Sequence, residues 1–236
     1  MSSIEDNAKR VIEACAEAAV RSGRAPEDVT LVAASKMNPA ENVRRAAAAG
    51  IKVFGENRVQ EMKEKLAAGA YEGSRLHLIG HLQTNKVKDV VGNCELIHSV
   101  DSEKLMGRLS DRALELGICQ PILLEINVGG ELSKSGIAPE MADELAAKAA
   151  EYPGIKVAGL MAIPPVEQNI AKTLHYFEIM RKLFIDMSGK KYDNTSIYVL
   201  SMGMSSDYRE AILAGANMVR VGTAIFGARD YGAPRA

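Results

Sequence analysis

The sequence predicts an α/β protein in which eight parallel strands alternate with helices and close into one (β/α)8 TIM barrel. The chain has 236 residues, close to the ~250 residues of a typical barrel of this kind. Apolar runs of strand length alternate with amphipathic helical patterns, as they do in parallel sheets. Hydrophobic residues make up 47% of the chain and tryptophan is absent, which suits a core of branched aliphatic side chains.

An additional helix is expected before the first strand. Apolar residues recur at helical spacing from Ile4 to Arg21, with charged residues between them. Gly23 and Pro26 end this pattern. We therefore expect one domain, residues 1–236, that consists of the barrel and an extra N-terminal helix.

The strands are predicted from apolar runs that end in polar or glycine-containing segments. They cover residues 31–36, 52–57, 76–80, 96–100, 122–128, 157–163, 196–201 and 218–221. Helices are expected over residues 39–50, 57–69, 102–117, 139–151, 170–187 and 207–215, with a short one ending at 91. The alternative is an open doubly wound sheet, but residues 35–38 lack the glycine-rich fingerprint that such a sheet carries after its first strand.

Three helix starts carry the spacing of a capping box, in which an N-cap side chain and a residue three positions later satisfy each other's backbone N–H groups. The pairs are Asn38 with Glu41, Asn57 with Gln60, and Asp207 with Glu210. Pro39 would then be the first residue of its helix.

Lys36 is the lysine around which the candidate site is built. It ends a buried apolar strand two residues before a helix begins, and ligands bind at that end of the strands in parallel α/β folds. A lysine facing a phosphate site indicates a Schiff base with a phosphorylated aldehyde. The simpler interpretation is a solvated lysine at the end of a strand.

The ends of the seventh and eighth strands are the predicted phosphate site, because barrels commonly bind phosphate there. Ser201 ends one strand and is followed by Met202 and Gly203, and Gly222 and Thr223 follow the other strand. Small residues let backbone N–H groups approach an anion, and the hydroxyl groups add donors. Helix capping is the alternative explanation for Ser205 and Ser206, and a tight turn is the alternative for Gly222.

Two further polar residues are candidates. Arg220 lies inside an apolar strand, so its side chain must reach a polar site or a buried acid. Asn57 is explained by helix capping, and a ligand contact is possible in addition. His77 and His98 are expected in the core or in support of the site, and Lys134 is expected to be solvated.

Composition limits the partners. A net charge of −1 argues against nucleic-acid binding, which needs a basic excess. The three cysteines and four histidines show no metal-ligand spacing, and no apolar run approaches the ~18 residues of a membrane span. We expect a cytoplasmic protein without a metal site, a membrane segment or a nucleic-acid partner.

Five sequence blocks together resemble the pyridoxal phosphate homeostasis protein family over nearly the whole chain. They are Ala33–Lys36, Phe54–Glu61, His77–Lys86, Ser201–Asp207 and Arg220–Thr223. The family is similar to the barrel domain of alanine racemase, which is the type III fold of pyridoxal phosphate (PLP) enzymes.

The resemblance implies a role for each candidate residue. Lys36 would form the Schiff base with PLP, and the phosphate would lie at four residues: Ser201, Gly203, Gly222 and Thr223. Arg220 would lie near the pyridine nitrogen, with Asn57 and Met202 beside the ring. No residue is assigned a catalytic role.

The resemblance also implies a function. We expect a monomer that buffers or carries PLP in the cell, with PLP-dependent apoenzymes as possible acceptors. Alanine racemases add a second domain that supplies a catalytic tyrosine, and the sequence ends at Ala236, so we expect the cofactor's outer face to be poorly covered. The alternatives are a PLP-dependent amino-acid racemase, a Schiff-base aldolase acting on a sugar phosphate, and a cofactor-free interaction protein.

Overall fold

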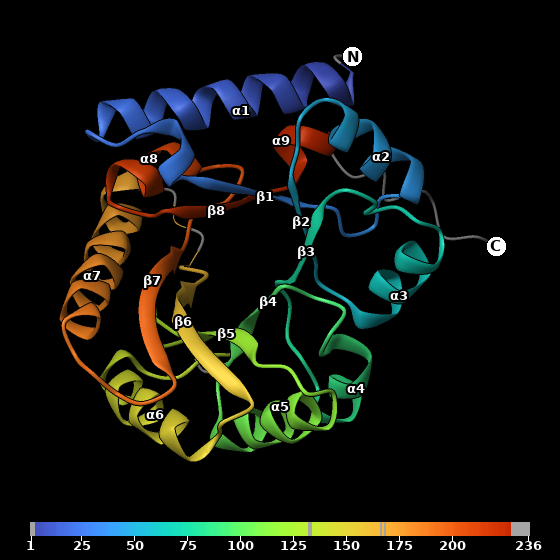
Figure 1. The fold of residues 1–236 in the computed structure, drawn as a ribbon. Helices are drawn as coiled ribbons and strands as arrows, with labels where there is room; N and C mark the ends of the chain where they lie inside the picture. Colours follow the sequence, from blue (N-terminus) through green and yellow to red (C-terminus); the bar gives the residue numbers. More distant parts are fainter. Residues whose placement is uncertain (1–2, 132–133, 166, 168, 228–236) are drawn as a thin grey trace.

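The computed structural model describes residues 3–131, 134–165, 167 and 169–227. Eight parallel strands form a closed barrel in chain order, and β1 pairs with β8 (Figure 1). The strands are β1 (Thr30–Ala34), β2 (Val53–Glu56), β3 (Arg75–Leu78), β4 (Leu96–Val100), β5 (Gln120–Ile126), β6 (Ile155–Ala162), β7 (Thr195–Ser201) and β8 (Met218–Val221). The predicted fold class is confirmed.

Helices surround the barrel (Figure 1). They are α1 (Ile4–Arg21), α2 (Ala40–Ala48), α3 (Val59–Ala67), α4 (Val87–Val90), α5 (Glu103–Glu115), α6 (Ala142–Lys148), α7 (Ile170–Ser188), α8 (Tyr208–Leu213) and α9 (Thr223–Phe226). Single 3-10 turns flank α6 on both sides, so the predicted helix over residues 139–151 is one α-helical segment between two tighter turns. No helix in these ranges is long and apolar enough to cross a membrane.

The N-terminal helix α1 has the predicted bounds. Ser3 is its N-cap and accepts a hydrogen bond from the Asp6 N–H at 3.0 Å, which satisfies one of the N–H groups left open at a helix start. The helix lies across α8 and α9, and its apolar face, with Val11 and Cys15, is buried there (Figure 1). It therefore covers the part of the barrel where the last strand meets the first.

Two of the predicted capping boxes are wrong. Helix α2 begins at Ala40 without a side-chain cap, because Asn38 instead donates to the Lys36 carbonyl (3.2 Å) and accepts from Asn42 (3.2 Å). Helix α3 begins at Val59, one residue beyond Arg58, also without a side-chain cap. The first start fails because the chain forms a turn between β1 and α2. At the second, the chain bends at Asn57 before the helix begins.

The third helix start is partly as predicted. Asp207 does precede α8, but its carboxylate accepts from the Met204 N–H at 2.6 Å and not from the first turn of the helix. This hydrogen bond closes the loop after β7, and the first turn of α8 has no side-chain cap.

Strand alternation divides the core into an inner and an outer layer. Ala33 and Phe54 face the helices, whereas Val32 and Leu123 pack inside the barrel. Arg220 is paired in register with Val32, and its guanidinium contacts inner groups. Its side chain therefore points into the barrel.

Candidate functional site

Lys36 lies in a tight turn between β1 and α2. The Asn38 N–H donates to the Ser35 carbonyl at 3.1 Å, and Met37 has a φ of 62°. A positive φ at the third position of a β-turn defines type II, and glycine is usual there. For a residue with a side chain, this conformation costs roughly 1–2 kcal/mol, so neighbouring contacts must stabilise the turn.

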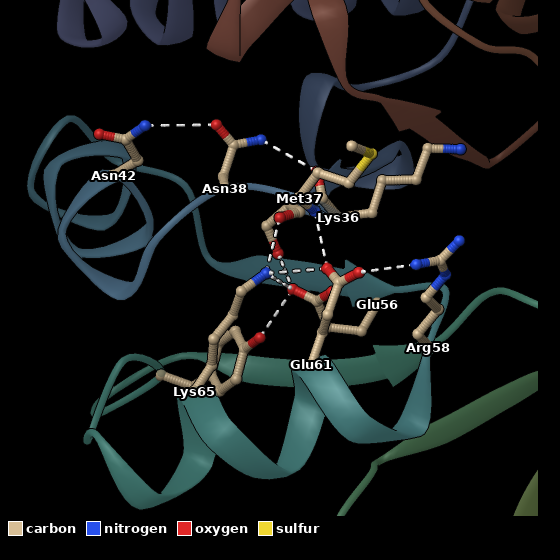
Figure 2. A network of polar contacts seen from close by, with 10 residues as sticks. Lys36, Met37, Asn38, Asn42, Glu56, Arg58, Glu61 and Lys65 are labelled. Atoms are coloured by element: carbon tan, nitrogen blue, oxygen red, sulfur yellow. Dashed lines mark hydrogen bonds and ion pairs between the residues drawn. The ribbon is translucent and has the colours of Figure 1, made fainter. Parts of the chain in front are cut away.

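Side chains from β2 and α3 supply those contacts (Figure 2). Glu61 Oε2 accepts from the Met37 N–H at 2.7 Å, and Lys65 Nζ donates to the Ser35 carbonyl at 2.7 Å. The Ser35 hydroxyl donates to Glu56 Oε1 at 2.5 Å. The turn that carries Lys36 is thus bonded on both sides to one neighbouring strand–helix unit.

Glu56 is the centre of this network and is fully buried. Besides Ser35, its Oε1 accepts from Lys65 Nζ at 2.6 Å and from the Tyr71 hydroxyl at 2.8 Å. Burial, followed by the charge of Glu56, raises the pKa of Tyr71, so its hydroxyl stays protonated and donates. A buried carboxylate is tolerated only when such donors compensate for lost hydration.

A pocket of about 280 Å³ opens beside Lys36. One wall is the turn and the start of α2, including Asn38 and Asn42, and the other is the segment after β8, including Gly222 and Thr223. The closed barrel makes β1 and β8 neighbours, so Lys36 and the segment after β8 meet although they are far apart in the sequence.

The segment after β8 presents backbone N–H groups at the start of α9. The Gly222 N–H donates to Ser205 Oγ at 3.1 Å, and the Ala224 N–H approaches the same oxygen at 3.4 Å. Ser205 thus places one oxygen where two N–H groups converge, an arrangement that suits an anion. A Cβ at Gly222 would lie 3.2 Å from the Ala34 carbonyl oxygen, so a side chain there would crowd β1.

Gly203 is required by packing. Its φ is +92°, and a Cβ would lie 2.4 Å from the Ala211 Cβ in α8. Met202 is fully buried, and its N–H donates to the Met218 carbonyl at 3.1 Å. Neither residue lines the pocket beside Lys36.

Ser201 and Arg220 belong to a polar chain inside the barrel. Arg220 donates to Ser201 Oγ at 2.5 Å and to the Ala162 carbonyl at 2.9 Å. Ser201 Oγ is 3.2 Å from His98 Nδ1, and His98 Nε2 is 3.0 Å from His77 Nδ1. The predicted phosphate role of Ser201 stays a prediction, because its hydroxyl is engaged here and is not among the groups that line the Lys36 pocket.

The charges in this interior are set by burial. Burial lowers the pKa of His77 to about 3 and that of His98 well below its usual value, so both rings are neutral. Burial also lowers the pKa of Arg220 to about 10, which leaves the guanidinium charged at neutral pH. Burial, with the nearby charge of Asp101, raises the pKa of Glu125 to about 7.

Asn57 is not explained by capping, contrary to the sequence-based interpretation. Its Oδ1 is buried and has no hydrogen-bond partner among the described residues. The chain is tightly packed at this point, because a Cβ at Gly80 would lie 2.3 Å from the Asn57 carbonyl oxygen. Buried acceptors are rarely left unpaired, so a group from a ligand or water is expected opposite this atom.

Sequence reasoning missed several residues of the site. Ser205 fits the pattern of a helix cap, and Glu61 and Lys65 carry no pattern beyond ordinary surface charge. The one available signal was Glu56, an acidic residue that ends an apolar strand. No group of three or more metal-ligating side chains exists within the described ranges.

Known proteins that are similar to the chain share one family. The alanine racemase N-terminal domain matches residues 12–230. The pyridoxal phosphate homeostasis protein of Aquifex aeolicus is 43% identical over 222 residues, 94% of this chain and 96% of that protein. Its counterpart in Escherichia coli K12 is 42% identical over 235 residues, 98% of this chain and 99% of that protein.

Solved structures that are similar to this chain include a member solved with PLP and an alanine racemase. PipY of Synechococcus elongatus, solved with PLP bound, has a TM-score of 0.77 and 37% identity, and covers 91% of this chain and 99% of its own. A Bifidobacterium adolescentis protein has a TM-score of 0.89 and 36% identity, with 94% of each chain covered. Alanine racemase from Corynebacterium glutamicum shares the fold alone, at 15% identity, a TM-score of 0.70, and coverage of 98% of this chain and 63% of the racemase.

Proposed function

The chain belongs to the alanine racemase N-terminal domain family and to the pyridoxal phosphate homeostasis proteins, and on that premise we propose that it binds PLP through a Schiff base on Lys36. The observation that carries the proposal is the pocket in which Lys36 lies opposite Gly222 and Thr223. A lysine amine and a cradle of backbone N–H groups are the two features that a phosphorylated aldehyde requires.

The described residues fit this cofactor. In our proposal the phosphate is bound by the N–H groups at the start of α9, with Thr223 and Ser205 adding hydroxyl donors. Ser201 and Gly203, at the end of the adjacent strand β7, are proposed as further contacts of the phosphate. Such a phosphate site, at the last two strands and a short extra helix, is common in barrels of this kind.

The ring is proposed to lie toward the barrel axis. Arg220 would be near the pyridine nitrogen, and Asn57 and Met202 would flank the ring. The unpaired Oδ1 of Asn57 supports this placement, because a ligand would give that buried acceptor a partner. PipY, at 37% identity, was solved with PLP bound, which supports the cofactor assignment.

We propose that the protein buffers or carries PLP and does not turn over amino acids at an enzyme-like rate. PLP, when bound, supplies an aldehyde that condenses with amines and a ring that withdraws electrons. The charged guanidinium of Arg220 would disfavour a proton on the pyridine nitrogen, and an unprotonated ring withdraws electrons less strongly. We further propose a cytoplasmic monomer with PLP-dependent apoenzymes as acceptors.

The deciding experiment is an absorbance spectrum of the purified protein with PLP, before and after borohydride reduction, followed by mass mapping of the modified lysine. We expect a Schiff-base band that disappears on reduction and a stable adduct on Lys36. Pyridoxal, which lacks the phosphate, should bind far more weakly, because each hydrogen bond to a charged group contributes roughly 1.5–3 kcal/mol. A spectrum without any Schiff-base band would contradict the proposal and favour a cofactor-free protein.

A further inference from the structure

The backbone after Lys36 is bonded to a side chain that lies outside the pocket. Glu61 Oε2 in α3 accepts from the Met37 N–H at 2.7 Å (Figure 2). We propose that Glu61 is a positioning residue, which fixes the turn so that Lys36 Nζ is presented to the aldehyde of the cofactor. This inference rests on the proposed function and extends it to a residue that does not line the pocket.

The two sides of the turn differ in what holds them. Ser35 is buried, and its N–H continues the strand ladder by donating to the Gly55 carbonyl at 3.0 Å. Met37, in contrast, is 57% exposed and has a φ of 62°. Little packing can hold a residue that is so exposed. Apart from the turn's own bond from the Asn38 N–H to the Ser35 carbonyl, the bond to Glu61 is the contact that keeps this strained residue in place.

Glu61 is itself held in position. Its carboxylate lies 3.8 Å from Lys65 Nζ and 4.0 Å from the Arg58 guanidinium, and its side chain is 20% exposed. Lys65 is the residue that bonds the Ser35 carbonyl on the other side of the turn. One helix, α3, therefore fixes the backbone both before and after Lys36.

Loss of the Glu61 contact should affect the covalent step more than the binding of the cofactor. Schiff-base formation joins Lys36 Nζ to the aldehyde carbon and releases water, so it depends on where the amine is held. The proposed phosphate contacts come from the ends of β7 and β8 and from α9, and they do not involve Glu61. Without its acceptor, the Met37 peptide would leave the strained conformation, and the amine would spend less time near the aldehyde.

The test compares Glu61→Ala with Glu61→Gln, whose amide oxygen can still accept from the Met37 N–H. The matched control is Glu64→Ala on the same helix, where the carboxylate is exposed and bonds only Gln60 among the described contacts. Each protein is mixed with PLP and, separately, with pyridoxamine 5′-phosphate, which has the same phosphate but no aldehyde. The rate of Schiff-base formation, the borohydride-fixed fraction on Lys36 and the Kd of pyridoxamine 5′-phosphate are measured, and folding is checked by circular dichroism.

We expect Glu61→Ala to form the Schiff base at least about 10-fold more slowly. Misplacing a reacting group by about 1 Å can lower a reaction rate by about 10²-fold. Its Kd for pyridoxamine 5′-phosphate should stay within about 2-fold of the unaltered protein. Glu61→Gln should restore most of the rate, and Glu64→Ala should match the unaltered protein. If Glu61→Ala does not fold, Glu61→Leu keeps the side-chain bulk without the acceptor and takes its place.

Two results would overturn the role of Glu61 and leave the proposed function standing. One is a normal rate of Schiff-base formation in Glu61→Ala, and the other is an equal loss of affinity for PLP and pyridoxamine 5′-phosphate, which would indicate general damage to the pocket. Failure of the unaltered protein to form any Schiff base would overturn the proposed function, and this inference with it.

Discussion

Lys36 is the residue on which the covalent part of the proposal depends. Replacement of Lys36 by alanine should abolish the borohydride-stable adduct, because no other amine is expected opposite the phosphate cradle. Some PLP should remain bound without a covalent link, since the proposed phosphate contacts lie on β7, β8 and α9. The measurement is peptide mass mapping after reduction, with Lys63→Ala as control because Lys63 is exposed on α3 and pairs with Asp89 at 2.9 Å. A full adduct on another lysine would refute the assignment of Lys36.

Gly203 illustrates a residue whose identity is set by packing. Gly203→Ala should destabilise the fold by about 2–4 kcal/mol, because a Cβ at φ +92° adds backbone strain and lies 2.4 Å from the Ala211 Cβ. Gly73→Ala is the matched control, since Gly73 also has a positive φ (+72°) but no atom within 4 Å of its Cβ. Urea denaturation of both variants measures the difference, and equal losses of about 1 kcal/mol would show that only backbone strain matters.

Glu125 allows a prediction about pH. Its pKa is raised from 4.5 to about 7 by burial, so the folded state binds the proton more tightly than the unfolded state does. Its contribution to stability is therefore full below about pH 4.5 and is lost as the pH rises through about 7. Glu125→Gln should remove this loss, which is on the order of 3 kcal/mol between pH 4.5 and pH 8.

The measurement for Glu125 is the free energy of unfolding by urea at both pH values. The unaltered protein and Glu64→Gln, which changes an exposed carboxylate, serve as references. The change in the free energy of unfolding between the two pH values is compared among the three proteins. If Glu125→Gln shows the same change as the references, Glu125 does not cause the loss of stability.

At the scale of elements, β2 and α3 form a unit that supports β1. Lys65→Met should destabilise the fold by roughly 3–5 kcal/mol, because it leaves the buried charge of Glu56 without its cation. Lys63→Met, two residues away, removes an exposed ion pair with Asp89 and should cost about 0–1 kcal/mol. Chemical denaturation of the two variants gives the comparison, and similar losses for both would argue against an energetic role of the buried pair.

The elements show which features a sequence can reveal. The bounds of α1, β4 and β8 agree with the prediction to the residue, because long amphipathic patterns and compact apolar runs are strong signals. The four-residue helix α9 was not predicted, whereas the equally short α4 was, because a segment of this length carries no period that decides for or against a helix. The capping boxes at Asn38 and Asn57 failed because the same spacing also occurs where the chain turns or bends before a helix begins.

The candidate site was predictable where it follows from topology alone. Lys36 and Gly222 end neighbouring strands of a closed barrel, so their meeting requires only the fold. The contacts of Glu61 with the Met37 N–H and of Lys65 with Glu56 depend on how α3 packs on β2. No residue spacing encodes that packing, and the sequence could not indicate these residues.

For the whole molecule, the proposed function predicts cofactor retention without rapid catalysis. The buried Arg220 keeps its charge at neutral pH, because its pKa remains near 10, and it would leave the bound pyridine ring a weak electron sink. Removal of a proton from an amino acid's α-carbon should then be slow. Protein saturated with PLP, incubated with L- and D-alanine, serine and other common amino acids, should give less than about one turnover per second, the low end of typical enzyme rates.

A faster rate would contradict the carrier proposal and favour an amino-acid racemase, provided that Lys36→Ala abolishes it and so excludes a contaminant. Arg220→Glu offers an internal test of the reason for slow turnover, since a carboxylate at this place would favour a proton on the pyridine nitrogen. It would also lie beside Glu125 in the barrel interior, so its folding must be verified first. If the variant folds and binds PLP, racemisation of alanine should rise above that of the unaltered protein, and an unchanged rate would show that Arg220 does not limit catalysis.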